Sequence, residues 1–541
     1  MTGSLHDYNA PVALSSSSVP RSLERRLGPV DAAAIVISNV IGVGIFITPG
    51  IIAQNVPHPL GILGVWLTGG LLAFAGAMAY AELAALRPRS GGEYVYLREA
   101  YGPLAAFLTG WTSFAAGFAG AIAAGALGVA EYLGGFVPAA NDPAPIFSIP
   151  VGRVLHLLVP WVQPSALPLV FSNRSIVALT AITGLALVHI RGLGPGKLVQ
   201  NTLAGLKVSA LALFVAVGLG WGHGTVAHLA PMQAAGPSNL AVAMLLVMFT
   251  YSGWNAASYV AEEIRNPGRN VPIALALGTG AVVVLYLGIN LLYLYALPVT
   301  QILHLAGSQT PVANAAAQVL LGATAAKLLG ALAVVILLSS LSAMTLAGPR
   351  VYYAMARDGV FFRSAARVHP RFHTPWLAIV TQAIWSGVLV LTNTSGQLAE
   401  YTGFAVLLFS GIAVTALFVL RRRCPDEPRP FRAWGYPVAP ALFALASFVI
   451  AADAIAGRPG PSVWGLVIMA FGIPLYLWLR RHLAAALFAL ASLIIAAFAI
   501  AGSLAPSAWA LVIVAAGCSL FCWMRRRDAI EDLASRGAPK A

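Results

Sequence analysis

Two short segments, each inside a long apolar run, combine glycine with polar residues in a way that could bind a charged small molecule. The first reads SNVIGVGIF over residues 38–46, and the second reads FTYSGWN over residues 249–255. Glycine destabilises a helix interior by about 1 kcal/mol relative to alanine, so both segments are candidate helix breaks. A break at Gly42–Gly44 would expose backbone N–H groups that suit a carboxylate, while freed carbonyls in both segments could accept hydrogen bonds from an ammonium group. The chemistry is that of a receptor for the head group of an amino acid.

The same glycines have a second interpretation, as small residues that let membrane helices pack closely. Non-helical backbone persists in a bilayer only where it is buried in protein or lines a cavity. Two breaks that lie five spans apart are also the sequence pattern of an inverted-repeat transporter with a site near the midplane. Packing and binding both remain open on these residues alone.

A single lysine, Lys207, lies in the middle of the apolar run LVQNTLAGLKVSALALF. A cation at the centre of a membrane helix costs about 2.5–3.5 kcal/mol on insertion scales, so it is a functional hypothesis by default. The alternative is a structural cation that donates to backbone carbonyls. In a functional role, the ammonium group could also release a proton during transport.

The elements that would hold these residues follow from the composition. Only 9% of the 541 residues are charged, against roughly a quarter in soluble domains, and 59% are hydrophobic with a mean hydropathy of +0.82. These figures exclude a soluble enzyme, a disordered chain and a fibrous repeat. Apolar runs long enough to span a bilayer predict an all-α integral membrane protein with about fourteen transmembrane helices. The predicted spans are 31–54, 60–86, 103–133, 175–190, 198–220, 239–261, 272–297, 325–349, 375–392, 400–420, 438–456, 462–479, 483–502 and 507–524.

The positive residues orient these spans. With the N-terminus inside and alternating sides, the inner segments hold 27 of the 32 Lys and Arg residues, as the positive-inside rule requires. We therefore expect both termini to be cytoplasmic in a multi-pass protein of the plasma (inner) membrane. We attribute the net charge of +14 to the cytoplasmic loops and to their contact with anionic membrane lipids. We expect no nucleic acid partner. The Pro-rich stretch 141–174 is expected to be an outer loop with a short interfacial helix.

The C-terminal end contains a tandem duplication. Residues 441–481 and 486–526 are identical at 26 of 41 aligned positions, which predicts two copies of one helical hairpin. Asp453 of the first copy is replaced by Phe498 in the second. A copy this close fits a peripheral hairpin better than a substrate site. Core function would then lie in the first ten spans.

Several residue types that an enzyme, a metal site or a cationic substrate would need are missing from the expected places. No histidine or carboxylate lies at a span centre, which argues against a membrane enzyme and against a cationic substrate. The run Ser339-Ser340-Leu341-Ser342 could supply oxygen ligands to a cation, or its hydroxyls could bond to backbone carbonyls. Cys518 and Cys522 are too few for a metal shell. We predict no metal, no cofactor and no covalently linked partner subunit, since no outer loop contains a cysteine.

Six stretches of the chain resemble the amino acid–polyamine–organocation superfamily, and within it the L-type amino acid transporter branch. They run from the first span to the start of the eleventh, and they keep the order and spacing of the family. The stretches are IGVGIFITPG (41–50), YAELAALRPRSGGEYVYLREAYGP (80–103), FTYSGWNAASYVAEEIRNPGRNVPIAL (249–275), GPRVYYAMARDGVFF (348–362), HTPWLAI (373–379) and LRRRCPDEPRPFRAWGYP (420–437). The unwound GSG of the family is Gly42-Val43-Gly44 here, which removes one side-chain donor.

The resemblance implies a five-plus-five inverted-repeat core, and the duplication adds two C-terminal hairpins. The units are a tail (1–30), a first repeat (31–221), a second repeat (239–421), a hairpin (438–481), its duplicate (482–526) and a tail (527–541). The resemblance also implies that Lys207 stands where sodium-coupled relatives hold sodium and supports the broken first helix. Phe249 would be an aromatic lid, and Trp254 and Asn255 would either shape the side-chain pocket or only pack. The substrate-binding residues are predicted to be Ile41, Gly42, Val43, Gly44, Ile45, Phe249, Thr250, Tyr251, Ser252, Gly253, Trp254 and Asn255.

The function that these features predict is secondary active transport of amino acids, with neutral amino acids as the substrates. Sodium-independent exchange and proton-linked uptake both remain open. The alternatives are a permease for cationic amino acids, polyamines or other amines, or, from another class, an integral-membrane enzyme or a transporter-like sensor. The terminal tails are too short to hold a signalling domain.

Overall fold

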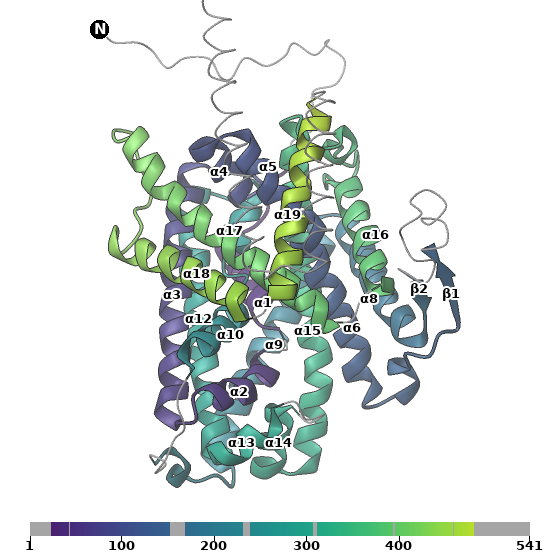
Figure 1. Cartoon of the computed structure of the whole chain (residues 1–541), viewed down its shortest axis with the longest axis vertical. Coiled ribbons are helices and arrows are strands. Elements are labelled where there is room, and N and C mark those ends of the chain that lie inside the picture. The colour runs from purple at the N-terminus through teal and green to yellow at the C-terminus, as the bar shows by residue number, and fades with distance from the viewer. Residues whose placement is uncertain are drawn as a thin grey trace, which may run out of the picture.

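The computed structural model describes residues 23–42, 44–151, 168–230, 239–306, 311–392, 395–457 and 459–480. Within these residues the chain is a bundle of helices with one small ribbon of strands at its side (Figure 1). The longer elements are α1 (Pro29–Val40), α2 (Gly44–Asn55), α3 (Pro59–Leu86), α4 (Glu93–Tyr101), α5 (Pro103–Thr112), α6 (Phe118–Gly134), α8 (Asn173–Ile190), α9 (Leu193–Trp221), α10 (Leu240–Thr250), α12 (Pro267–Ala296), α13 (Val299–Leu305), α14 (Val312–Leu321), α15 (Ala323–Arg357), α16 (Trp376–Thr392), α17 (Ser395–Arg423), α18 (Val438–Gly457) and α19 (Pro459–Leu479). The short elements are η1 (Ser113–Gly117), η2 (Pro138–Asn141), β1 (Phe147–Pro150), β2 (Pro168–Phe171), η3 (Val226–Leu229), α11 (Ala256–Tyr259), η4 (Ala261–Glu263) and η5 (Arg363–Ala366).

The helices have the length and composition of a multi-pass membrane protein. Among the described residues, seven helices are long and apolar enough to span a bilayer, and the bent pair α1 and α2 makes an eighth. Shorter apolar helices include α10, α14 and α16. Each of the first twelve predicted spans coincides with a helix or with a broken helix pair. The last two, 483–502 and 507–524, lie outside the described residues.

The predicted outer loop at 141–174 contains strands. β1 and β2 pair antiparallel, with Phe147 opposite Phe171, and their rings stack with centroids 4.4 Å apart. Residues 152–167, where the predicted interfacial helix would fall, lie outside the described residues. Cross-strand aromatic pairs of this kind stabilise short ribbons.

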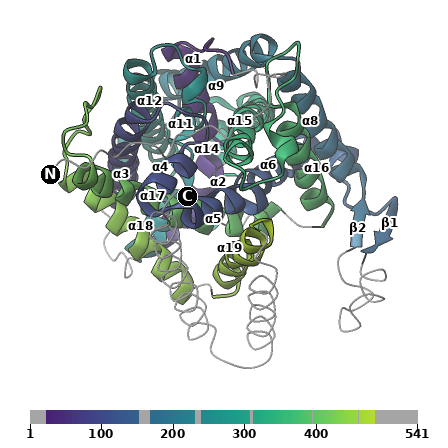
Figure 2. The ribbon, with the colours of Figure 1, turned by 90° about the horizontal axis from the view of Figure 1, so that it is seen from above.

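The broken helices lie inside the bundle. α1 packs against α9, α12 and α15, and α10 packs against α2 and α3. Seen from above, α2, α11 and α15 lie near the middle, while α3, α12, α8 and α16 lie toward the rim (Figure 2). Close packing of α1 on α12 depends on Gly278, because a Cβ there would lie 2.7 Å from Val36. The bundle therefore surrounds the two segments that the sequence marks as helix breaks.

The helix that contains the predicted span 325–349 is longer than the span. α15 runs from Ala323 to Arg357, so Arg350 and Arg357, which the charge pattern places in an inner segment, lie on its last turns. Polar residues do not end a helix when their side chains find partners inside the protein. Arg350 has such a partner, the carboxylate of Glu263.

Candidate functional site

The first break separates α1 from α2. α1 ends at Val40, α2 begins at Gly44, and the two helix axes differ by 47°. Ile41, between them, has extended backbone at φ −75° and ψ 99°. A Cβ on Gly42 would meet no atom within 4 Å, so there is open space beside this residue. Val43 lies outside the described residues.

The second break separates α10 from α11. Residues 251–255 form a turn, and Gly253 has φ +99°, a conformation that L side chains rarely adopt. The carbonyl of Gly253 accepts a hydrogen bond from Asn39 Nδ2 at 3.1 Å. The break therefore rests directly on the end of α1.

The two breaks contact each other. The hydroxyls of Thr48 and Thr250 lie 3.2 Å apart, and a Cβ on Gly44 would lie 3.2 Å from the Thr250 side chain. Tyr286 of α12 bridges them, because its hydroxyl lies 3.1 Å from the carbonyl of Val40 and 3.3 Å from that of Thr250. Segments about 200 residues apart in sequence thus form one unit, as a shared binding site requires.

Lys207 supports the end of α1. Its side chain is fully buried, and Nζ donates to the carbonyls of Ile41 at 2.7 Å and Ser38 at 3.2 Å. These carbonyls are among the acceptors that the end of a helix leaves without intrahelical donors. The position fits both interpretations of this lysine, the functional cation and the structural one. Nearby, Ser339 Oγ donates to Ser38 Oγ at 2.9 Å.

The predicted site residues divide into two groups by exposure. Gly42, Gly44, Phe249, Ser252 and Gly253 are partly exposed. The buried residues are Ile41, Ile45, Thr250, Tyr251, Trp254 and Asn255. A small molecule could reach backbone atoms of the first group, whereas the side chains of the second group fill the core.

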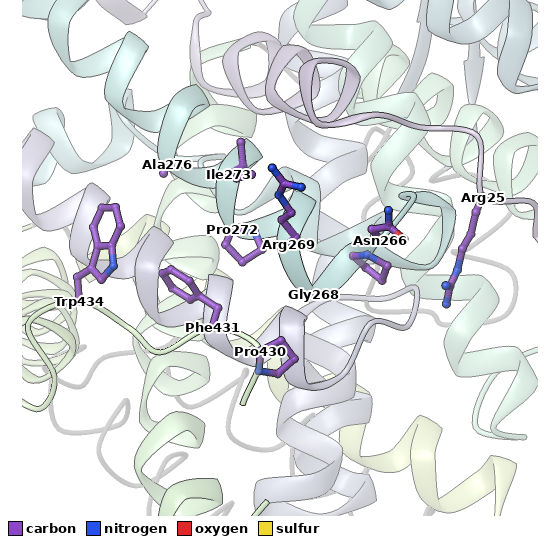
Figure 3. A pocket seen from close by; sticks show the side chains of 11 residues that line it. Arg25, Asn266, Gly268, Arg269, Pro272, Ile273, Ala276, Pro430, Phe431 and Trp434 are labelled. Atoms are coloured by element: carbon purple, nitrogen blue, oxygen red, sulfur yellow. The ribbon is translucent and has the colours of Figure 1, made fainter. Parts of the chain in front are cut away.

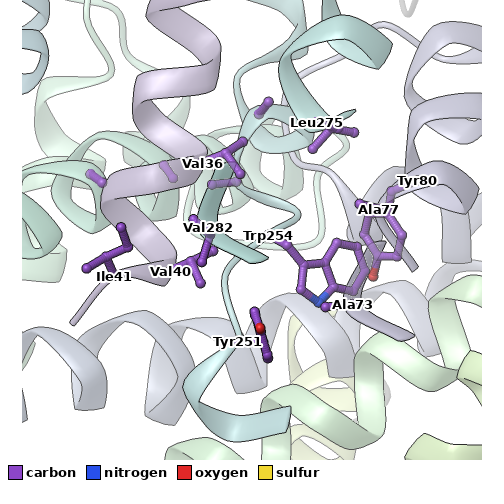
Figure 4. Packing of buried hydrophobic residues seen from close by; sticks show 14 of the residues in the cluster. Val36, Val40, Ile41, Ala73, Ala77, Tyr80, Tyr251, Trp254, Leu275 and Val282 are labelled. Carbon is purple, nitrogen blue, oxygen red and sulfur yellow. The ribbon is translucent and has the colours of Figure 1, made fainter. Parts of the chain in front are cut away.

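The buried aromatic side chains near the second break make packing contacts. Trp254 lies beside Tyr80 and Ala73 (Figure 4), with ring centroids 4.9 Å apart for Trp254 and Tyr80. The hydroxyl of Tyr251 donates to the carbonyl of Trp66 at 3.2 Å. Of the two interpretations of Trp254, these contacts favour packing. Phe249 instead lies against Gly403 of α17, where a Cβ would be 2.7 Å from its ring.

Asn255 leads to a buried carboxylate that the sequence did not reveal as part of this region. Its Nδ2 donates to Glu93 Oε1 at 2.7 Å, and the hydroxyl of Tyr80 donates to the same oxygen at 2.7 Å. Glu93 begins α4, outside the apolar spans. Burial raises the pKa of Glu93 above its ordinary value, although its hydrogen-bond donors oppose that effect. Its position in the sequence, after Gly91 and Gly92, gives no sign of burial.

Ion pairs gather at the end of the bundle that carries α4, which we call the α4 end. Arg350 and Glu263 are both fully buried and form a bidentate pair at 2.7 and 3.0 Å. The other pairs at this end are Arg357–Glu262, Arg89–Asp358, Arg98–Asp358, Arg421–Glu82, Arg429–Glu82, Arg87–Glu99 and Arg87–Glu427. Arg265 and Arg269, also at this end, have no ionic partner among the described residues. No group of three or more potential metal ligands occurs in the described part of the chain.

Comparisons with known proteins agree with one another. A family model described as "Amino acid permease" matches residues 27–479. The serine/threonine exchanger SteT of Bacillus subtilis (strain 168) is 28% identical over 465 residues, covering 86% of this chain and 98% of that protein. The human large neutral amino acids transporter small subunit 2 is 28% identical over 469 residues, covering 84% of this chain and 80% of the relative. The human cystine/glutamate transporter is 27% identical over 467 residues, covering 84% of this chain and 85% of the relative.

Proposed function

We propose, from the premise that this chain belongs to the amino acid permease family, that it carries neutral amino acids by alternating access at the two helix breaks. Membership of the family makes the chain a multi-pass membrane transporter of amino acids. The observation that supports the site is the direct contact between the breaks, through Thr48 and Thr250 and through the bridging hydroxyl of Tyr286. A substrate bound there would touch both halves of the chain at once.

The head group of the substrate would bind to backbone atoms. Its carboxylate would accept from the N–H groups around Gly42 and Gly44 at the start of α2, where the helix dipole is positive. Its ammonium group would donate to the carbonyls of Tyr251 and Ser252, because the carbonyl of Gly253 already accepts from Asn39 Nδ2 and from the N–H of Ala256. Because Lys207 already donates to the carbonyl of Ile41, the acceptors on the second break are the better partners for the ammonium group.

Neutral side chains fit this site best. The described residues of both breaks carry no carboxylate, and the nearby Glu93 is occupied by Tyr80 and Asn255. Two of the relatives are named for serine and threonine or for large neutral amino acids, whereas one is named for cystine and glutamate. Cationic amino acids and polyamines remain the alternative substrates. They would require a carboxylate in the pocket as a partner, which the described residues of the breaks do not supply.

The architecture that we propose is an inverted repeat of residues 31–221 and 239–421. The hairpin 438–481 and its copy 482–526 follow, with both termini in the cytoplasm and the chain in the plasma membrane. Two observations support this arrangement. The broken spans are five spans apart, and the α4 end of the bundle carries the arginine-rich connections that the positive-inside rule assigns to the cytoplasm.

We propose sodium-independent exchange as the mode of transport, with the Lys207 ammonium group acting where a sodium ion would otherwise support α1. The test is uptake of radiolabelled amino acids into proteoliposomes, with a panel of neutral, acidic and cationic substrates, with and without sodium. Unlabelled substrate loaded inside is one driving force, and an inward proton gradient is the other. Uptake of neutral amino acids driven only by loaded substrate supports exchange, while uptake driven by the proton gradient would overturn it in favour of proton coupling.

Lys207→Met tests the role of the lysine. It removes two charge-assisted hydrogen bonds to the end of α1 but keeps the length of the side chain, so exchange should fall about tenfold or more. Lys197→Met is the matched control, because Lys197 lies on the same helix, is half-exposed and pairs with Asp31 at 2.7 Å. Full exchange by the Lys207 variant would show that its ammonium group is not needed.

A further inference from the structure

A cavity of about 570 Å³ lies outside the transport site, at the α4 end of the bundle. Three segments enclose it, namely the chain before α1, the first turns of α12 and the connection between α17 and α18 (Figure 3). Its two ends differ in chemistry. Arg25 and Asn266 lie at one end and Trp434 lies at the other, near Ala276, while Phe431, Ile273 and Arg269 lie between them (Figure 3).

The polar part of the cavity is positively charged. Arg25 and Arg269 are exposed, neither forms an ion pair among the described residues, and no carboxylate lines the cavity. The first turn of α12 adds the backbone N–H of Gly268 and the positive end of the helix dipole. Pro267 has no N–H, and the N–H of Arg269 donates to the carbonyl of Asn266 at 3.0 Å. The N-cap residue, Asn266, forms no side-chain cap. This combination favours an anion with a phosphate or a similar group.

The walls of the cavity are held in place by the fold. Leu27, two residues after Arg25, donates to the carbonyl of Glu263 at 2.9 Å and accepts from the N–H of Arg265 at 2.9 Å. A Cβ on Gly268 would lie 3.0 Å from Pro430, so the connection after α17 rests on the start of α12. The arginine end is therefore built from segments in direct contact.

The apolar part of the cavity continues onto the lipid-facing surface of α12. Ile273 lines the cavity, and Leu277 and Val284, one and about three turns further along the helix, have exposed fractions of 59% and 71%. Trp434 is 59% exposed, and its ring lies 6.1 Å from that of Phe74 on α3. A half-exposed tryptophan beside an apolar helix face is typical of the level of the lipid head groups.

We propose that this cavity binds one anionic phospholipid of the cytoplasmic leaflet. The phosphate group would lie at the Arg25 and Arg269 end, and the acyl chains would lie along Ile273, Leu277 and Val284. The assignment to the cytoplasmic leaflet rests on the membrane orientation proposed above. The contacts with the lipid rest only on the residues that line the cavity. A soluble anion would use the arginine end but would leave the apolar end and Trp434 without a role, so the lipid is the better occupant.

The test is native mass spectrometry of the full chain in detergent, titrated with phosphatidylglycerol or with phosphatidylcholine of the same acyl chains. The wild-type chain should bind its first phosphatidylglycerol about tenfold more tightly than phosphatidylcholine. The double variant R25Q/R269Q should lose this preference. The matched control is R363Q/R422Q, which removes two other exposed arginines at the same end of the bundle and should keep it. Because binding is the readout, failure here is distinguishable from failure of transport.

A second variant tests the apolar end independently. Ala276→Phe fills the cavity beside Ile273 and should weaken binding of phosphatidylglycerol without changing the charge, so the proposal stays testable if the arginine variants fold poorly. Equal affinity of the wild-type chain for both lipids would overturn the proposal. So would an equal loss of preference in R363Q/R422Q. Displacement of the bound lipid by millimolar inorganic phosphate would identify a soluble anion as the occupant instead.

Discussion

Glu93 is a buried carboxylate that links α4 to the second helix break. Burial raises its pKa, so between the ordinary and the raised value the folded state holds a proton that the unfolded chain has released. The stability that this residue contributes is therefore complete below its ordinary pKa and is lost as pH rises through the raised value. Glu93→Gln keeps the side-chain size and an acceptor for Tyr80 and Asn255 but cannot ionise. We expect its melting temperature to depend less on pH than that of the wild-type chain, with equal or higher stability at neutral pH.

The control for this prediction is a carboxylate whose pKa is lowered instead of raised. Arg87 donates to both carboxylate oxygens of Glu427 and holds the pKa of Glu427 below its ordinary value. The stability that Glu427 contributes is present above its ordinary pKa and is lost as pH falls through the lowered value. Glu427→Gln should therefore lower stability at neutral pH. Melting curves recorded between acidic and neutral pH test both variants, and an unchanged pH profile in Glu93→Gln would show that Glu93 does not titrate in this way.

Sequence reasoning predicts the burial of Lys207 but not the burial of Glu93, for a physical reason. An apolar run of membrane length predicts burial of everything within it, so a lysine at its centre stands out, and the structure buries Lys207 against the end of α1. Glu93 lies in a polar connection whose sequence predicts exposure. Its burial results from tertiary packing, because Tyr80 of α3 and Asn255 from the second break converge on α4. No local pattern contains that information.

At the scale of elements, the turn between α10 and α11 depends on Gly253. Alanine there would keep an unfavourable φ of +99° and would bring its Cβ to 2.6 Å from Asn39 Nδ2 and 2.9 Å from the Asn39 carbonyl oxygen. Positive φ alone costs about 1–2 kcal/mol, and the clash adds to it by pushing the break away from α1. Gly253→Ala should abolish exchange and lower the melting temperature.

The variant Gly102→Ala separates the cost of backbone strain from the cost of the clash with Asn39. Gly102 also has positive φ, +94°, but a Cβ there would meet nothing within 4 Å. This variant should lose stability through strain alone and should keep exchange. Equal exchange by both variants would mean that the contact between the two breaks is not required for transport.

The helix breaks themselves could be located from the sequence, but the end of α15 could not. Glycines beside polar residues in an apolar run mark Gly42–Gly44 and Gly253 as candidate breaks, and the structure decides between a break and close helix packing. Arg350 gives the wrong signal, since an arginine after an apolar run is typical of a loop. Only the fold supplies Glu263, and with it the reason that the helix continues.

The pair of Arg350 and Glu263 joins α15 to η4, just after the second break. Both side chains are fully buried, and removal of one partner from a buried ion pair leaves an uncompensated charge that costs about 3–5 kcal/mol. Glu263→Gln should therefore lower the free energy of unfolding by an amount in this range, measured by denaturant or thermal unfolding in detergent. The exposed pair of Arg26 and Glu24 provides the control, because Glu24→Gln should change stability by less than about 1 kcal/mol. Similar losses in the two variants would contradict this account.

At the scale of the whole molecule, the first C-terminal hairpin is part of the bundle. The indole N–H of Trp111 on α5 donates to the carbonyl of Ile468 at 2.8 Å, and the rings of Phe107 and Tyr476 lie 5.3 Å apart. α18 packs against α3 and α17. The hairpin therefore covers apolar surface of the core helices, and its loss would expose that surface.

The duplicated hairpin should be dispensable for transport. The family model ends at residue 479, and residues 486–526 repeat 441–481 at 26 of 41 positions without Asp453. A chain that stops at residue 481 keeps both helix breaks, Lys207, the α4-end ion pairs and the first hairpin. It should purify as a folded protein and exchange amino acids in proteoliposomes at the wild-type rate. A chain that stops at residue 437 is the control and should aggregate, because it lacks the hairpin that packs on α3, α5 and α17. If the chain ending at 481 folds but no longer exchanges, the second hairpin takes part in transport, and residues 1–481 are not the complete functional unit.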